Sequence, residues 1–206
     1  MPQTLYRYLW LLALALAAAG CDRAAKPVFH GSDITGANFG LSLALTDHNG
    51  RAVTLDTFKG KLVVLFFGYT HCPDVCPTTL SDLAEAFKQM PKGTSAKVQV
   101  LFVTVDPERD TPDVLRAYVP YFDPSFLGLY GSQEQVALAA KEFRVVYRRQ
   151  VEPGAEGYLV DHSAGSYVLD GHGRMRLYLP YGHSPHDIAS DLATLLQADG
   201  LVAGGA

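Results

Sequence analysis

Two mainly apolar runs lie in the middle of the chain, a continuous one at residues 62–67 and a second at 98–105. Each is too short for a core helix and is rich in β-branched and aromatic residues, which favours a strand buried on both faces. Between them, Leu80, Leu83 and Phe87 recur at the spacing of one helix face. A strand, a helix and a second strand in this order predict two neighbouring parallel strands joined by a right-handed crossover.

Weaker patterns predict further strands and helices on both sides of this unit. Apolar residues alternate on either side of the turn residues 47–50, which predicts a β-hairpin over residues 41–55. Ser132 followed by Gln135 predicts a helix over 132–143 that begins with a capping box. The other expected elements are a helix after the N-cap Thr111, strands over 127–130 and 145–149, a hairpin over 166–179 and a last helix over 185–197 capped by Ser184. This order predicts an α/β domain with a mixed sheet flanked by helices.

The composition fits one such domain and argues against one class of partner. The chain has 206 residues, of which 48% are hydrophobic, enough for one domain with a sizeable core. Charged residues make up only 18% and the formal net charge is -4. A nucleic-acid-binding surface needs clustered lysines and arginines that neutralise phosphates, so we expect no nucleic-acid partner.

The first 21 residues differ from the rest of the chain. Arg7 precedes an apolar run over 9–19, which is the pattern of a secretory signal peptide. The residues 18–21, Ala-Ala-Gly-Cys, resemble a bacterial lipobox. We therefore expect cleavage before Cys21, lipidation of that cysteine and anchoring at the periplasmic face of the bacterial inner membrane. Residues 22–35 would then be a tether and residues 36–200 the folded domain. An uncleaved membrane anchor and an unmodified cysteine remain the alternatives.

The loop around Cys72 and Cys76 carries the most distinctive chemistry of the chain. Both cysteines lie between a buried strand and the next helix, where the helix dipole and free backbone amides stabilise thiolates. A structural disulfide between residues four apart would close only a small loop and gain little. Thioredoxin-type redox enzymes use Cys-x-x-Cys, whereas this spacing has one more residue, which leans toward a metal site. A pair of soft thiolates selects Cu(I), and imidazole is a suitable third ligand.

The seven histidines differ in sequence context. Five lie in the tether, in hairpin turns or at a helix start, where we expect exposed side chains: His30, His48, His172, His183 and His186. His71 adjoins Cys72, and we expect it near the site rather than in it. His162 lies in a predicted loop before a sheet strand. The residues alone leave open whether it is a ligand or a structural histidine.

Three motifs taken together resemble the Sco/SenC family: Gly-Tyr-Thr-His-Cys-Pro-Asp-Val-Cys-Pro at 68–77, Val-Asp-Pro-Glu-Arg-Asp-Thr-Pro at 105–112 and Asp-His-Ser at 161–163. The resemblance spans about residues 35–197. It implies a thioredoxin-like mixed sheet flanked by helices, with an N-terminal β-hairpin and a hairpin insertion.

The resemblance also implies a function and a set of site residues. Family members bind Cu(I) or Cu(II) through two cysteines and a histidine, which here correspond to Cys72, Cys76 and His162. Asp161 is then expected to position His162, as metal-bound histidines generally require. The chain would be a copper chaperone rather than an enzyme. Its implied partners are the copper-bearing subunit of cytochrome c oxidase, a periplasmic thiol reductant and the membrane.

Other chemistries compete with this one. A thiol-disulfide oxidoreductase that reduces cysteines of a copper-site partner would need Cys72 and Cys76 but not His162. A peroxidase would need threonine and arginine partners, for which Thr70, Thr79 and Arg109 are candidates. Zinc is disfavoured because this ligand set leaves a tetrahedral ion one protein ligand short. The 106–112 segment is expected to be structural, a turn and helix cap held by Arg109 and two carboxylates.

Overall fold

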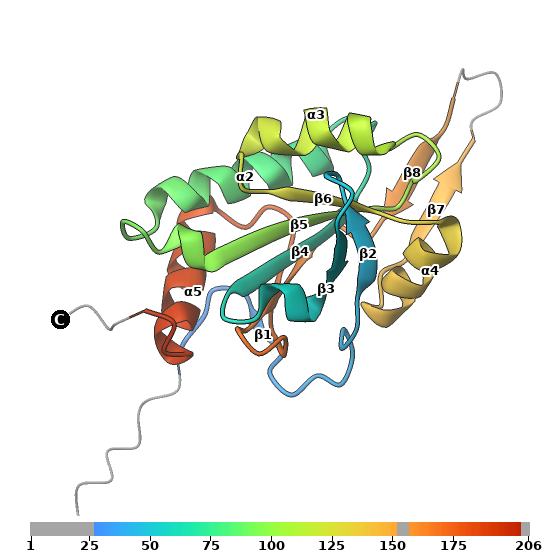
Figure 1. The fold of residues 1–206 in the computed structure, drawn as a ribbon. Helices are drawn as coiled ribbons and strands as arrows, with labels where there is room; N and C mark the ends of the chain where they lie inside the picture. Colours follow the sequence, from blue (N-terminus) through green and yellow to red (C-terminus); the bar gives the residue numbers. More distant parts are fainter. Residues whose placement is uncertain (1–26, 152–156, 203–206) are drawn as a thin grey trace, which may run out of the picture.

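The computed structural model describes residues 27–151 and 157–202. A mixed sheet of eight strands runs through this part of the chain in the order β1-β10-β9-β4-β5-β6-β2-β3 (Figure 1). Its strands are β1 (Ser32–Asp33), β2 (Ala44–Asp47), β3 (Ala52–Thr54), β4 (Leu62–Gly68), β5 (Val98–Thr104), β6 (Leu127–Tyr130), β9 (Ser166–Leu169) and β10 (Met175–Leu179). Short 3-10 helices, η1 (Leu55–Phe58) and η2 (Ser95–Lys97), precede β4 and β5. The mixed α/β sheet expected from the sequence is confirmed.

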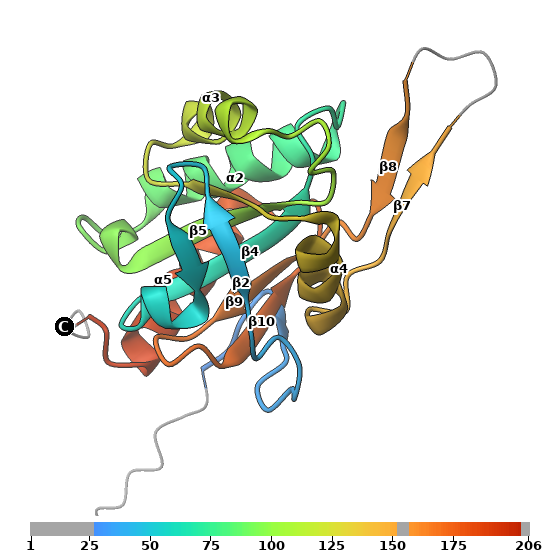
Figure 2. The ribbon, with the colours of Figure 1, turned by 45° about the vertical axis from the view of Figure 1, so that its right-hand side comes forward.

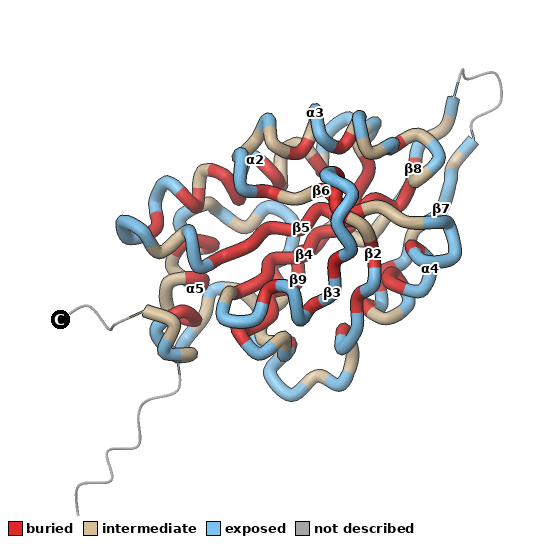
Figure 3. The backbone as a smooth tube through the Cα atoms, in the orientation of Figure 1, coloured by how far each residue is buried: buried red, intermediate tan, exposed pale blue. Residues whose placement is uncertain are grey.

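The two apolar runs form the centre of the sheet. Strands β4 and β5 are parallel neighbours, and every residue of both is buried (Figure 3). Strand β6 is parallel to β5 on one side, and β9 is antiparallel to β4 on the other. Because both faces of these strands are buried, apolar residues occupy most of their positions and do not alternate with polar ones.

Four α-helices surround the sheet in the described residues: α2 (Val75–Gln89), α3 (Pro112–Phe122), α4 (Gln133–Glu142) and α5 (Pro185–Ala198). Helix α2 contacts α3 and α5, whereas α4 packs against β2 away from them (Figure 1). The predicted N-caps are confirmed: Thr111, Ser132 and Ser184 each accept a hydrogen bond from a backbone amide of the first turn. None of the helices in the described ranges is long and apolar enough to cross a bilayer.

Helix α2 begins earlier than the sequence indicated. We expected a loop up to Pro77, but the helix starts at Val75, so Cys76 and Pro77 lie in its first turn. Proline is tolerated there because the first amides of a helix have no partner within the helix. The correction matters because it places Cys76 on a rigid element.

A two-stranded hairpin stands outside the main sheet. Strands β7 (Tyr147–Gln150) and β8 (Leu159–His162) pair with each other and project from the body of the molecule (Figure 2). His162 was expected in a loop. It is instead the last residue of β8, paired across the hairpin with Tyr147.

The predicted signal peptide, the lipobox and Cys21 lie outside the described residues. The expected tether, residues 22–35, is described from residue 27 onward. There Ser32 and Asp33 form β1 against β10, and the backbone amides of His30 and Gly31 donate to the Asp191 carboxylate at 2.8 and 2.7 Å. This part of the segment is therefore packed on the domain.

Candidate metal centre

Two cysteines occupy the junction between β4 and α2. Cys76 is fully buried in the first turn of α2, while Cys72 is half-buried in the loop before it, and both are free thiols. The Cys76 backbone amide donates to the Cys72 sulfur at 3.4 Å. The helix start thus directs a backbone N–H at the outer sulfur, as expected for a site that stabilises a thiolate.

His162 reaches this pair from the hairpin. Its Nε2 lies 3.3 Å from the Cys76 sulfur, and its Nδ1 lies 3.0 Å from the backbone carbonyl oxygen of Ser163. A carbonyl oxygen only accepts, so Nδ1 donates to it, and Nε2 is the ring nitrogen that faces the cysteines. The rings of Phe66 and Tyr69 meet the imidazole edge to face, each with a centroid distance of 5.9 Å.

The three side chains form one group that could hold a metal ion. The Cys72 and Cys76 sulfurs and one ring nitrogen of His162 all lie within 4.8 Å of one another. No other group of three or more histidines, cysteines and acidic residues within the described ranges meets this criterion. Two soft sulfurs and one imidazole suit copper, whereas tetrahedral zinc would lack a fourth protein ligand.

The two thiols differ strongly in acidity. The Cys76 thiol donates a hydrogen bond that lowers the pKa of Cys72 to about 4, and the backbone amides of Asp74 and Cys76 act in the same direction. The same hydrogen bond and burial raise the pKa of Cys76 well above its ordinary value. In the metal-free protein the accessible sulfur is therefore the thiolate and the buried one is the thiol.

Gly68, the last residue of β4, leaves room for the buried sulfur. A Cβ atom at this position would lie 2.8 Å from the Cys76 sulfur and 2.8 Å from a ring carbon of Phe102. Carbon atoms in proteins do not approach so closely without a shift of one partner. A glycine is thus required here by the close approach of the sulfur, a feature that its motif alone does not reveal.

Asp110 supports the cysteine loop from below. Its buried carboxylate accepts from the Thr70 amide at 3.0 Å, and from the hydroxyls of Thr70 and Thr104 at 2.6 Å each. Burial raises the pKa of Asp110. The 106–112 segment was expected to be held by Arg109 and two carboxylates; in the structure Arg109 pairs with Asp106, while Asp110 holds the cysteine loop. In the sequence, the only sign of this role is that Asp110 directly precedes the N-cap Thr111.

The side chains of the two other residues expected around the site, Asp161 and His71, have partners other than the His162 imidazole. The Asp161 carboxylate accepts instead from the Gln150 side chain at 2.6 Å, and the imidazole is oriented by the Ser163 carbonyl. His71 is exposed, with Nδ1 at 3.2 Å from the Thr70 hydroxyl and 3.9 Å from Asp110. It lies beside the site without joining the three-residue group.

The remaining histidines lie away from the group. His30, His172 and His186 are exposed, as expected, and His183 is half-buried. The prediction that His48 is exposed is wrong. The residue is 4% exposed, and its Nδ1 accepts a hydrogen bond from the Gly128 amide at 3.0 Å. The turn residues around His48 indicated exposure, but β6 covers this end of the β2–β3 hairpin and buries the side chain.

Comparison with known proteins gives the site its context. The SCO1/SenC family model matches residues 32–197. The chain belongs to the SCO1/SenC family. Its thioredoxin-like fold, expected from the resemblance, is thereby confirmed, and all three motifs lie inside the matched range.

Several family relatives are known. The mitochondrial protein SCO2 of Saccharomyces cerevisiae is 42% identical over 132 residues, which cover 63% of this chain and 44% of the yeast protein. The chain therefore spans less than half the length of that relative. A solved structure of Bradyrhizobium japonicum ScoI with copper bound is 40% identical with a TM-score of 0.70, covering 77% of this chain and 99% of that one. Apo Sco1 of Thermus thermophilus is 42% identical with a TM-score of 0.74, covering 84% and 99%.

Proposed function

We propose that this SCO1/SenC protein binds one copper ion through Cys72, Cys76 and His162 and delivers it to the copper-bearing subunit of cytochrome c oxidase. The observation that carries the proposal is the convergence of two sulfurs and an imidazole nitrogen within 4.8 Å. The copper bound to the related ScoI supports the choice of metal. Cytochrome c oxidase as the recipient follows from the family resemblance.

The asymmetry of the site suits delivery. Cys72 and His162 are half-buried and can be approached by a ligand of a partner, while the buried Cys76 would hold the ion from the inside. Copper then leaves by stepwise ligand exchange, in which an incoming thiolate or imidazole replaces the outer sulfur first. No bond within the protein is made or broken, so the chain acts as a chaperone.

A Cu(I) competition titration against a chromophoric chelator tests the proposal. The reduced protein is expected to bind one equivalent, and Cys72→Ser and His162→Ala are expected to weaken binding by about tenfold or more. His172→Ala is the matched control because this histidine is exposed in a turn away from the site. Binding that ignores both ligand substitutions would reject the three-residue site.

A second candidate function is thiol-disulfide exchange on cysteines of the copper recipient. It is favoured by the low pKa and partial exposure of Cys72. The Cys72 thiolate would attack a partner disulfide and form a mixed disulfide, and Cys76 would resolve it. The partner then leaves with two thiols, and the chain keeps a Cys72–Cys76 disulfide. A periplasmic thiol reductant would reduce this disulfide and return both cysteines to thiols. Reduction of a model disulfide that survives His162→Ala would support this reaction.

We also propose that the chain is anchored by lipid at Cys21 on the periplasmic face of the bacterial inner membrane. The signal-peptide pattern and the lipobox-like residues 18–21 support this placement. Metabolic labelling with a fatty-acid analogue should mark the wild-type chain and spare Cys21→Ser. Equal labelling of both, or of neither, would reject lipidation at this cysteine.

A further inference from the structure

The position of His162 depends on how the β7–β8 hairpin is held. Within the described residues, β7 and β8 pair with each other and with no strand of the main sheet. Figure 2 shows the hairpin projecting from the domain, with β8 leading back to β9. His162 ends β8, whereas the two cysteines sit on the β4–α2 junction. Contacts between the hairpin and the domain must therefore set the distance between imidazole and sulfurs.

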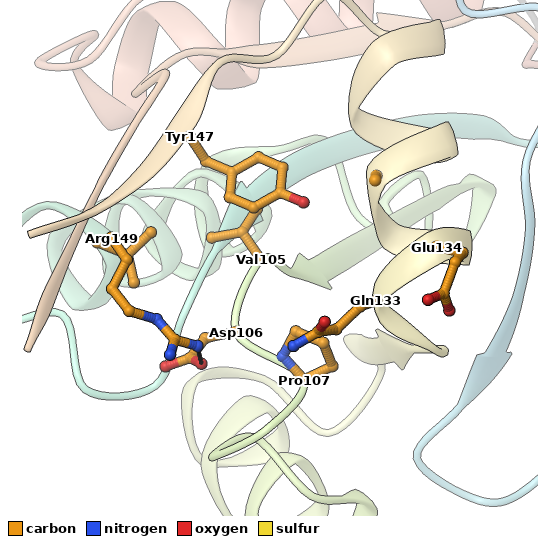
Figure 4. Close-up of a pocket in the computed structure, with 9 residues that line it drawn as sticks. Val105, Asp106, Pro107, Gln133, Glu134, Tyr147 and Arg149 are labelled. Atoms are coloured by element: carbon orange, nitrogen blue, oxygen red, sulfur yellow. Dashed lines mark ion pairs between the residues drawn. The ribbon is translucent and has the colours of Figure 1, made fainter.

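The hairpin is not packed tightly against the domain along its whole length. A pocket of about 410 Å³ lies between β7, the start of α4 and the residues that follow β5 (Figure 4). Tyr147 and Val160 line it from the hairpin, and Val105 and Pro107 from the domain. Val160 is nevertheless 6% exposed and belongs to the buried core, against which Tyr147 also packs, so apolar contacts hold one side of the hairpin and the pocket leaves the other side open. In Figure 4, Asp106 and Arg149 approach one another at the edge of the pocket, where their closest N and O atoms are 4.0 Å apart.

Tyr158 joins the hairpin to the domain at the start of β8. Its ring lies between two guanidinium groups, with the Arg109 Cζ 3.6 Å and the Arg149 Cζ 4.0 Å from the ring centroid. Its hydroxyl donates to the Asp106 carboxylate at 2.7 Å. Cation–π stacking on both faces and a charge-assisted hydrogen bond at the edge fix the ring in three directions.

Arg109 is the centre of this arrangement. Its Nε donates to the Asp106 carboxylate, and its Nη1 donates to the backbone carbonyl oxygen of Tyr158 at 2.9 Å. The same guanidinium lies 5.7 Å from the ring centroid of Tyr69. Tyr69 in turn contacts the imidazole of His162, and its hydroxyl is hydrogen-bonded to the backbone of Val160 in β8. One side chain thus bridges the domain, the start of β8 and the residue that touches His162.

We propose that Arg109 is a positioning residue of the metal site. With Asp106 and Tyr158 it forms a clasp that holds β8 against the domain, so that the Nε2 atom of His162 reaches the Cys76 sulfur. The hydrogen bonds of Arg109 go to Asp106 and to the Tyr158 carbonyl and not to Cys72, Cys76 or His162, so it acts on the imidazole through β8 and through the Tyr69 ring. The inference rests on the proposed function, because it assigns a role in that same site.

A double-mutant cycle tests this role. Arg109→Gln removes the stacking cation and both hydrogen bonds, and Tyr158→Phe removes only the hydroxyl bond to Asp106. By analogy with residues that orient metal ligands, Arg109→Gln is expected to weaken Cu(I) binding about tenfold or more. In a His162→Ala background the same change should have no further effect, because its effect passes through that imidazole. Arg148→Gln is the control, because Arg148 is exposed next to Arg149 in β7. This variant should bind Cu(I) as tightly as wild type.

Two outcomes of the cycle contradict the proposal. If Arg109→Gln weakens binding equally with and without His162, its effect on the site is general damage and not positioning. If wild type and Arg109→Gln bind alike while His162→Ala binds weakly, the clasp is irrelevant but the three-residue site stands. Failure of the wild-type protein to bind copper would instead reject the proposed function.

A second measurement needs no metal. Amide hydrogen exchange in β8 of the metal-free protein should speed up in Arg109→Gln and, to a smaller extent, in Tyr158→Phe. Exchange in the central strands β4 and β5 should stay as in wild type, which shows that the domain remains folded. Exchange in β8 that is unchanged in both variants would overturn the clasp even if copper binding were altered.

Discussion

At the scale of single residues, the two sulfurs of the site differ in acidity and in exposure. Cys72 is partly exposed and has a lowered pKa, while Cys76 is buried and has a raised one. The cause is local, because Cys76 donates to Cys72 and the start of α2 adds backbone amides. In the metal-free protein the reactive thiolate is therefore the sulfur nearer the surface.

This asymmetry predicts selective alkylation of the metal-free protein. Because the pKa of Cys72 is about 4, its reaction with iodoacetamide should stay fast from pH 8 down to about pH 5 and slow only below that. Cys76 should react far more slowly throughout. Peptide mass spectrometry after timed labelling measures both rates. Equal rates, or a Cys72 rate that falls tenfold per pH unit from pH 8 downward, would contradict the assignment.

A second prediction concerns the glycine beneath the site. Gly68→Ala places a methyl group 2.8 Å from the Cys76 sulfur and 2.8 Å from a ring carbon of Phe102, so the sulfur or the ring must shift. We expect weaker Cu(I) binding and a loss of stability of about 1–3 kcal/mol, the usual range for overpacking. Chelator competition and urea denaturation measure the two effects. Copper affinity and stability equal to those of wild type would contradict the close contact.

At the scale of elements, the sequence predicts what local patterns determine. The apolar runs gave β4 and β5, and the capping residues Ser132 and Ser184 gave the starts of α4 and α5. The start of α2 was missed because Pro77 reads as a helix breaker, although the first turn of a helix accepts proline. Of the β7–β8 hairpin, the sequence predicted the first strand, over 145–149, but it missed β8, where a loop was expected.

The hairpin β2–β3 shows how tertiary packing overrides a turn pattern. His48 lies in the turn, yet it is buried, and it accepts a hydrogen bond from Gly128 of β6. Its backbone carbonyl also accepts from Arg116 of α3 at 2.5 Å. The turn thus joins three elements that are far apart in the sequence, and no local signal could reveal that.

The burial of His48 predicts a pH-dependent stability. Burial lowers the pKa of His48, so the folded state binds its proton less readily than the unfolded state does. The contribution of neutral His48 is present above the unfolded pKa of about 6.5 and is lost as pH falls through the folded value. Denaturation at pH 7 and pH 5 should show a smaller difference in His48→Gln than in wild type. An equal difference in both proteins would contradict this assignment.

At the scale of the whole molecule, the site is assembled from segments remote in sequence. Cys76 and His162 are 86 residues apart, and they meet because the β4–α2 junction and the end of β8 lie at the same end of the sheet. The sequence could name Cys72 and Cys76 from their loop. It could name His162 only through the family resemblance, since proximity across the fold has no local signature. The contacts of Tyr158 with Arg109 and Asp106 lay beyond both kinds of reasoning.

The central claim is that two sulfurs and one imidazole nitrogen bind the same copper ion. X-ray absorption spectroscopy of the reduced protein loaded with one equivalent of Cu(I) tests it most directly. We expect two sulfur ligands and one nitrogen ligand in wild type, loss of the nitrogen in His162→Ala and loss of one sulfur in Cys72→Ser. A copper environment that is the same in wild type and His162→Ala would contradict it.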